Sequence, residues 1–184
     1  MATSSTAADV WETIAGEAAR ESRIWGDALR PAGEREFDAV FSSLGEPRFA
    51  LGLETIYEGY LLHYGRPRLF APADSDTALL LGDYLYAHGL VRVAAVDGVA
   101  AVSDLAELIS LCAQLRAGGG GDDGPLWAAS AALLGAGRLD DARTALRMRG
   151  DAAALDAIAR ATAGDGPVER ALALHRTRLH TAPG

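Results

Sequence analysis

The fold is decided by the stretch Thr77-Ala78-Leu79-Leu80-Leu81-Gly82-Asp83-Tyr84-Leu85. This stretch lies within a segment, residues 75–96, that contains no proline. Asp74 or Ser75 can cap a helix here, because either side-chain oxygen can accept a bond from a free backbone N–H. The leucines make the predicted helix apolar on nearly every side, which is typical of a buried helix. We therefore expect residues 75–96 to form a helix at the centre of the molecule.

Helical spacing of apolar residues continues on both sides of this stretch, and no segment alternates convincingly as a strand would. The chain is therefore predicted to be all-α, an antiparallel helical bundle. The expected helices cover, in chain order, residues 8–29, 34–44, 47–64, 75–96, 99–117, 125–136, 139–149, 152–163 and 168–179.

Glycine divides the chain into three predicted parts. Four consecutive glycines at 118–121, followed by Asp122-Asp123-Gly124, predict a linker over residues 118–124, since such a run does not hold regular structure cheaply. Residues 1–117 are then a helical bundle, and residues 125–184 are short alanine-rich helices that pair as hairpins.

Two motifs carry a resemblance to a known family. Gly65-Arg66-Pro67 and the quoted stretch ending in Gly82-Asp83-Tyr84-Leu85 follow one another at the spacing found in the trans-polyprenyl diphosphate synthases. The resemblance covers roughly residues 47–115. It implies a truncated version of the isoprenoid-synthase bundle, and it implies that metal-binding acids should precede Gly65.

The acids at that place depart from the family pattern. The family's Asp-Asp-x-x-Asp spacing falls on Glu54, Thr55 and Glu58, so two carboxylates remain one helical turn apart. His63 and Tyr64 stand where the family has two arginines, and neither side chain clamps a phosphate bidentately. No second Asp-Asp-x-x-Asp motif follows, and the resemblance therefore implies a relative without catalytic residues.

Five residues are candidates for residual ligand binding: Glu54, Glu58, Arg66, Arg68 and Asp83. The two glutamates could hold a weak Mg²⁺ site, but a charged stripe on an apolar helix is the favoured interpretation, because magnesium needs more oxygen ligands. Asp83 is predicted to be buried and paired with one of the two arginines. No cofactor or metal centre is predicted, since the histidines lack zinc-ligand spacing.

Aromatic residues cluster around the same region. The five tyrosines of the chain lie between residues 57 and 86. They could line an isoprenoid tunnel, although packing in the core is the commoner use of such side chains.

The composition of the chain limits the classes of partner that it is expected to bind. The net charge is −8 and the chain has no lysine and no basic block, so it is a poor candidate for binding nucleic acid. The single cysteine, Cys112, is expected to be a buried apolar residue in a reducing compartment. Without a secretion signal or an apolar stretch of about 20 residues, the chain is expected to be cytoplasmic, with no transmembrane segment.

The leading functional hypothesis is a non-catalytic subunit that associates with a catalytic polyprenyl diphosphate synthase. One alternative is a free-standing helical protein that binds an isoprenoid or quinone-like tail. Another is a general protein-interaction module, and the least favoured is an enzyme with altered metal ligands. The identity of partner or ligand and the oligomeric state stay open, because fold resemblance does not carry function.

Overall fold

The computed structural model describes residues 4–119 and 121–179 and shows an all-α protein. Within these residues the only β-type pairings are two isolated bridges. The helices are α1 (Ser4–Glu21), α2 (Arg23–Asp27), α3 (Ala50–Tyr64), α4 (Ser75–Asp97), α5 (Val99–Ala117), α6 (Gly124–Ala132), α7 (Asp140–Arg149), α8 (Ala153–Ala163) and α9 (Asp165–Arg178).

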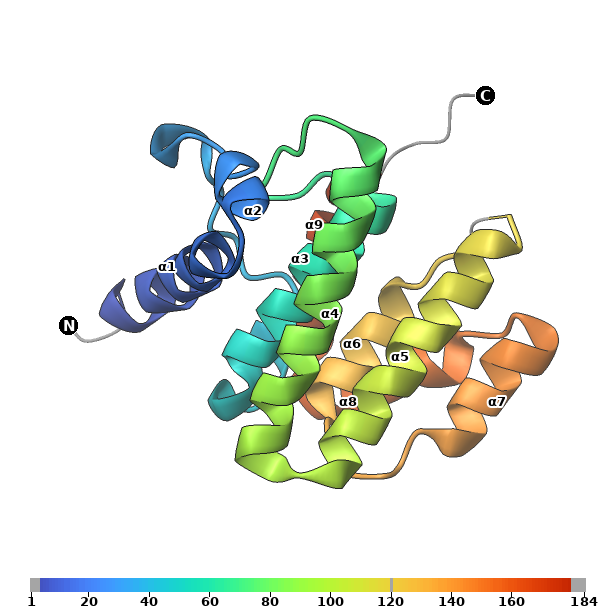
Figure 1. Ribbon diagram of the computed structural model, residues 1–184. Helices are drawn as coiled ribbons and strands as arrows, with labels where there is room; N and C mark the ends of the chain where they lie inside the picture. Colours follow the sequence, from blue (N-terminus) through green and yellow to red (C-terminus); the bar gives the residue numbers. More distant parts are fainter. Residues whose placement is uncertain (1–3, 120, 180–184) are drawn as a thin grey trace.

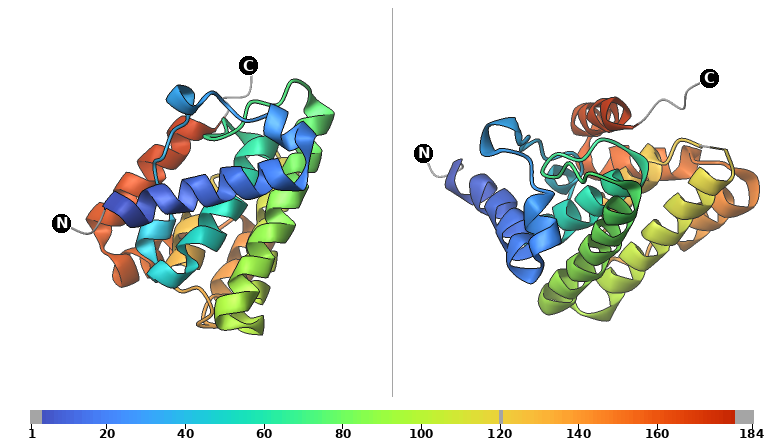
Figure 2. Two further views of the ribbon diagram at one scale, coloured as in Figure 1. Left: turned by 60° about the vertical axis from the view of Figure 1, so that its left-hand side comes forward. Right: turned by 45° about the horizontal axis from the view of Figure 1, so that its top comes forward.

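The predicted central position of residues 75–96 is wrong: α3 is the central helix. Every residue from 52 to 62 on α3 is buried, whereas α4 buries one face and leaves Leu79 and Leu80 more than half exposed. In Figures 1 and 2, α3 lies between α4 on one side and α9 on the other. The leucine run therefore supplies both a packed face and an outer face of α4.

The contact between α3 and α4 depends on glycine. A Cβ at Gly59 would lie 2.9 Å from the carbonyl oxygen of Gly82, and one at Gly89 would lie 3.1 Å from that of Gly52. A Cβ at Gly82 would also meet His63 Nε2 at 2.6 Å. Gly59 and Gly89 thus allow the two backbones to approach closely, while Gly82 of the Gly-Asp-Tyr motif leaves space for the His63 side chain.

The helix predicted over residues 34–44 is also wrong. Short 3₁₀ turns occupy Ala32–Glu34 and Ser42–Leu44, and the chain between them runs without helical bonds. The backbone groups there bond to other segments, since Glu36 N–H donates to the carbonyl of Arg68 and the carbonyl of Asp38 accepts from the Arg68 side chain. Tertiary contacts have overridden a weak helical preference.

The core is continuous across the glycine-rich segment 118–124. Phe41, Tyr57 and Tyr60 pack in one cluster with Trp127 of α6 and with Leu172 of α9. A second, smaller cluster joins α1 to the start of α4 through Trp11, Ile14 and Leu81. Helices on both sides of the predicted linker therefore share one core, and α1 covers its edge (Figure 2).

Candidate functional site

The candidate site is built on α3, where Glu54 and Glu58 lie one turn apart and face the loop that follows the helix. This loop turns back through Gly65 and Pro67 and inserts Arg68 beside both carboxylates. All three charged side chains are buried, with Arg68 at 0% exposure. The charged stripe predicted on this apolar helix is therefore covered by the returning loop.

Arg68 binds both acids directly. Its Nη1 lies 2.6 Å from Glu54 Oε2, and its Nε lies 2.9 Å from Glu58 Oε2. The same Nη1 donates to the backbone carbonyl of Asp38 at 2.8 Å. The guanidinium lies 4.5 Å from the ring centroid of Trp11 and 5.0 Å from that of Tyr57, which adds cation–π attraction.

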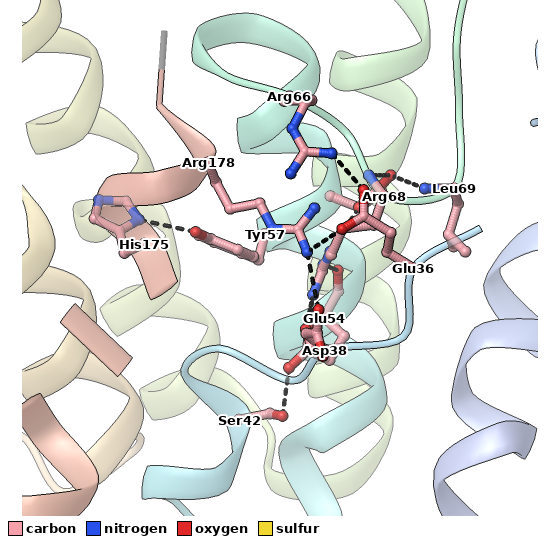
Figure 3. Close-up of polar contacts among 11 residues, drawn as sticks. Glu36, Asp38, Ser42, Glu54, Tyr57, Arg66, Arg68, Leu69, His175 and Arg178 are labelled. Atoms are coloured by element: carbon pink, nitrogen blue, oxygen red, sulfur yellow. Dashed lines mark hydrogen bonds and ion pairs between the residues drawn. The ribbon is translucent and has the colours of Figure 1, made fainter. Parts of the chain in front are cut away.

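The remaining carboxylate oxygens also have partners. Glu58 Oε1 accepts the backbone N–H groups of Arg68 and Leu69 at 2.8 and 2.7 Å, and Ser42 donates its hydroxyl to Glu54 Oε1. Figure 3 shows Ser42, Glu54 and Arg68 together beside α3. We call Arg68, Glu54, Glu58 and Ser42 the Arg68 cluster.

The charge balance of the Arg68 cluster explains how it tolerates burial. Burial alone would lower the pKa of Arg68, but the two adjacent carboxylates raise it above its ordinary value. The arginine therefore stays charged inside the protein. One guanidinium supplies the positive charge for two carboxylates. The hydrogen bonds from Ser42 and the loop backbone stabilise the remaining negative charge.

A second buried polar group lies on the other side of α3. Asp123 Oδ1 is 3.0 Å from His175 Nε2, and Asp123 Oδ2 accepts the Tyr60 hydroxyl at 2.7 Å. Arg116 donates to both oxygens of this carboxylate. We call Asp123, His175, Tyr60 and Arg116 the Asp123 cluster.

Tyr57 joins the two clusters. Its ring lies against Arg68, and its hydroxyl is 2.8 Å from His175 Nδ1 (Figure 3). The tautomer with its proton on Nε2 fits both contacts, since Nδ1 then accepts from Tyr57 and Nε2 donates to Asp123. The polar groups thus form a connected path through the core from the Arg68 loop to α9.

Burial and neighbouring charges set the ionisation states. Burial raises the pKa values of Tyr57 and Tyr60 far above the ordinary tyrosine value, so both hydroxyls stay protonated. Burial would also raise the pKa of Asp123, but hydrogen bonds from His175 and Tyr60, together with the charge of Arg116, hold it below its usual value. A buried aspartate anion therefore faces three donors, His175, Tyr60 and Arg116.

Two of the predicted site residues lie elsewhere. Asp83 is not buried: its side chain is 65% exposed and its Oδ1 lies 3.3 Å from His63 Nε2, so the predicted pairing with Arg66 or Arg68 is wrong. Arg66 is half-exposed and pairs with Glu36. Asp83 lies at the surface because it falls on the outer face of α4, one position beyond the buried Gly82.

Sequence reasoning missed the Asp123 cluster. Asp123 stood out only as a linker acid, and it is separated by 63 residues from Tyr60 and by 52 from His175. Its one local signal is its position directly before Gly124 and Pro125, where a helix starts. Arg178 was missed as well. This buried side chain on α9 contacts Glu36 at 2.8 Å and Asp38 at 3.1 Å, which fixes the end of α9 to the segment before α3.

A magnesium ion does not fit the residues at the Arg68 cluster. All four oxygens of Glu54 and Glu58 are bonded to protein donors, and a divalent ion would have to displace Arg68. Among the described residues, no group of three or more His, Cys, Asp or Glu side chains is placed to hold a metal. The arrangement can hold segments together, but it offers no open ligand position.

By length and composition α4 could cross a membrane. The core helix of a soluble protein passes the same test, so the absence of a transmembrane segment stays a prediction. No family model, curated protein or solved structure matches the chain. The resemblance to polyprenyl diphosphate synthases therefore stays a prediction from the quoted motifs.

Proposed function

We propose that the chain is a non-catalytic subunit that associates with a catalytic polyprenyl diphosphate synthase. One observation carries the non-catalytic part: Arg68 fills the space between Glu54 and Glu58, where the resemblance would place metal ions. A prenyl transfer site must leave carboxylate oxygens free for metal-bound diphosphate. Here those oxygens are used to hold the loop after α3.

The contrast between retained and changed residues supports the proposal. Gly82 and Leu85 of the motif pack α4 on α3, so this part of the resemblance has a structural use in this chain. At the place of the two expected arginines, His63 lies beside Asp83 and Tyr64 packs against the main core. The packing residues are kept while those that would bind diphosphate are not.

An exposed apolar surface supports the proposal that the chain associates with another protein. Among the exposed large apolar side chains are Leu80, Val91 and Val99, which lie on α4 and α5. Contiguous exposed apolar surface on a soluble chain commonly marks a protein interface. This observation favours association with another protein over a free-standing chain.

Binding of an isoprenoid tail is the second candidate. A hollow of about 220 Å³ between α9 and residues 39–43 has mostly apolar walls, including Val40, Pro167 and Leu174. Typical small-molecule sites are larger, about 300–1,000 Å³. Two of the tyrosines that could have lined a tunnel, Tyr57 and Tyr60, pack instead around Trp127, so this function is less well supported.

Purification of the chain from its native host tests the proposal. We expect a catalytic synthase with intact aspartate motifs to be recovered in stoichiometric amount, and its product chain length to change when this chain is omitted from a reconstituted assay. Recovery of the chain without a synthase would contradict the partner model. Turnover of allylic and isopentenyl diphosphates by the isolated chain, lost in a folded Glu54→Gln variant, would contradict the non-catalytic assignment.

A further inference from the structure

The hollow of about 220 Å³ between α9 and residues 39–43 has a defined shape. Val40 and Ala171 form its floor, since both line it and both are almost fully buried. Pro167 and Leu174 line it along α9, and the part of the helix between them is about 10 Å long at about 1.5 Å per residue. We call this feature the α9 hollow.

Arg170 brings positive charge to the α9 hollow. It lies on α9 between Pro167 and Leu174 and lines the hollow with them. Its Nη1 lies over the first turn of the helix, 3.5 Å from the position that a Cβ would take on Gly166. The N-terminal end of a helix carries partial positive charge, so the helix dipole and the guanidinium both attract an anion to this place.

The acids of the same region are bound by other arginines. Asp165 and Glu169 pair with Arg160, and Glu169 also pairs with Arg176. Within the described part of the chain, Arg170 forms no ion pair of its own. Its guanidinium is therefore available to an anion that comes from solution.

The rest of the lining combines apolar walls with one hydroxyl. Ala39, Pro167 and Leu174 turn carbon atoms toward the hollow, and Leu174 is 37% exposed. Ser43 is exposed at the same hollow and adds a hydroxyl, which can donate a hydrogen bond. A hydrocarbon that covers these walls removes apolar surface from water, which stabilises its binding.

We propose that the α9 hollow binds a small carboxylic acid with an apolar tail, of the size of hexanoate. A guanidinium can bind both oxygens of a carboxylate, which places the head of the ligand at Arg170. The tail then lies over Val40 and against Leu174. An amine with the same tail is repelled by Arg170, and a long isoprenoid tail exceeds the length of the hollow.

The inference does not rest on the proposed function, so the isolated full-length chain tests it. The isotope-labelled chain is titrated with hexanoate and followed by amide NMR. We expect saturable shifts confined to residues 39–43 and 167–174. The affinity should fall by up to about fourfold for each methylene removed from the tail, and hexylamine should cause no saturable shifts.

Variants at exposed positions test the two parts of the site. Arg170→Met keeps a long side chain without the charge and should weaken hexanoate binding by about three- to fivefold. Ala39→Phe should fill the hollow and abolish saturable binding. Arg138→Met is the matched control, because Arg138 is an exposed arginine beside a separate hollow lined by Leu133 and Ile158. It should leave the affinity unchanged, and unchanged circular dichroism shows that each variant is folded.

Four results would overturn the inference. They are shifts that do not saturate with hexanoate, the same saturable shifts with hexylamine, an affinity that Arg170→Met leaves unchanged, and shifts centred on Leu133 and Ile158.

Discussion

The Arg68 cluster and the Asp123 cluster are both buried ion networks on α3, but their charges are distributed in opposite ways. In the first, one fully buried arginine serves two buried carboxylates. In the second, one buried carboxylate is shared by a histidine, a tyrosine and Arg116, whose side chain is 18% exposed. From this difference we expect the loss of unfolding free energy on breaking such a network to depend on whether the charge left without a partner can reach water.

The Arg68→Met variant should show the largest effect. It leaves two carboxylates buried without a cation, and breaking a buried pair in this way costs about 3–5 kcal/mol. Urea unfolding followed by circular dichroism measures the loss. Arg66→Met is the matched control two residues away, and it should cost at most about 1 kcal/mol because its pair with Glu36 is partly exposed. Equal losses would contradict the distinction.

The Asp123→Asn variant should lose less, about 1–3 kcal/mol, although it removes the centre of its cluster. Arg116 can turn toward solvent when the carboxylate charge disappears, and the amide still accepts one hydrogen bond. Asp122→Asn is the control, since Asp122 is exposed and only its Oδ1 bonds the backbone of Gly124. A loss as large as that of Arg68→Met would show that Arg116 is not free to move.

The Tyr57→Phe variant separates the two roles of the residue that joins the clusters. The ring beside Arg68 is kept, while the hydroxyl that bonds His175 Nδ1 is removed. We expect a loss of about 1 kcal/mol, the usual net value of one hydrogen bond. Thermal unfolding measures it, and a loss above about 3 kcal/mol would mean that the hydroxyl also supports the Arg68 cluster.

The pH dependence should show the smallest effect, and only on the Asp123 side. The pKa of Asp123 is lower in the folded chain than in the unfolded chain, where it is about 3.9. Its contribution is therefore complete above about pH 4 and is lost as the pH falls through the folded value. The stability difference between wild type and Asp123→Asn should shrink below pH 4, by less than about 1.4 kcal/mol per pH unit. A difference that grows with acid would reverse the sign of the shift.

The sequence predicted most of the helices because their limits are encoded locally. The predicted helix 99–117 has the bounds of α5, and the predicted 75–96 differs from α4 by one residue. Glycine and proline mark these ends directly. The segment 34–44 was mispredicted because the backbone groups of Glu36 and Asp38 bond to Arg68, a tertiary contact that no local pattern reveals.

The site was predicted only where its residues are close in sequence. Glu54 and Glu58 were recognised as a pair because four residues make one helical turn. Their partner Arg68 was not recognised, since the loop that inserts it is held by contacts with residues 36 and 38, which are distant in sequence. His175 and Asp123 meet only after α9 packs on the core, and neither residue lies in a sequence motif that would predict this contact.

The central claim is that the cation of the Glu54–Glu58 pair is Arg68. A double-mutant cycle of unfolding free energies tests it most directly, with Arg68→Met, the pair Glu54→Gln/Glu58→Gln, and all three changes combined. The claim predicts strong coupling. The loss of unfolding free energy in the triple variant should be smaller than the sum of the separate losses by at least about 1 kcal/mol, because no unpaired charge remains buried. Losses that add within about 0.5 kcal/mol would contradict it.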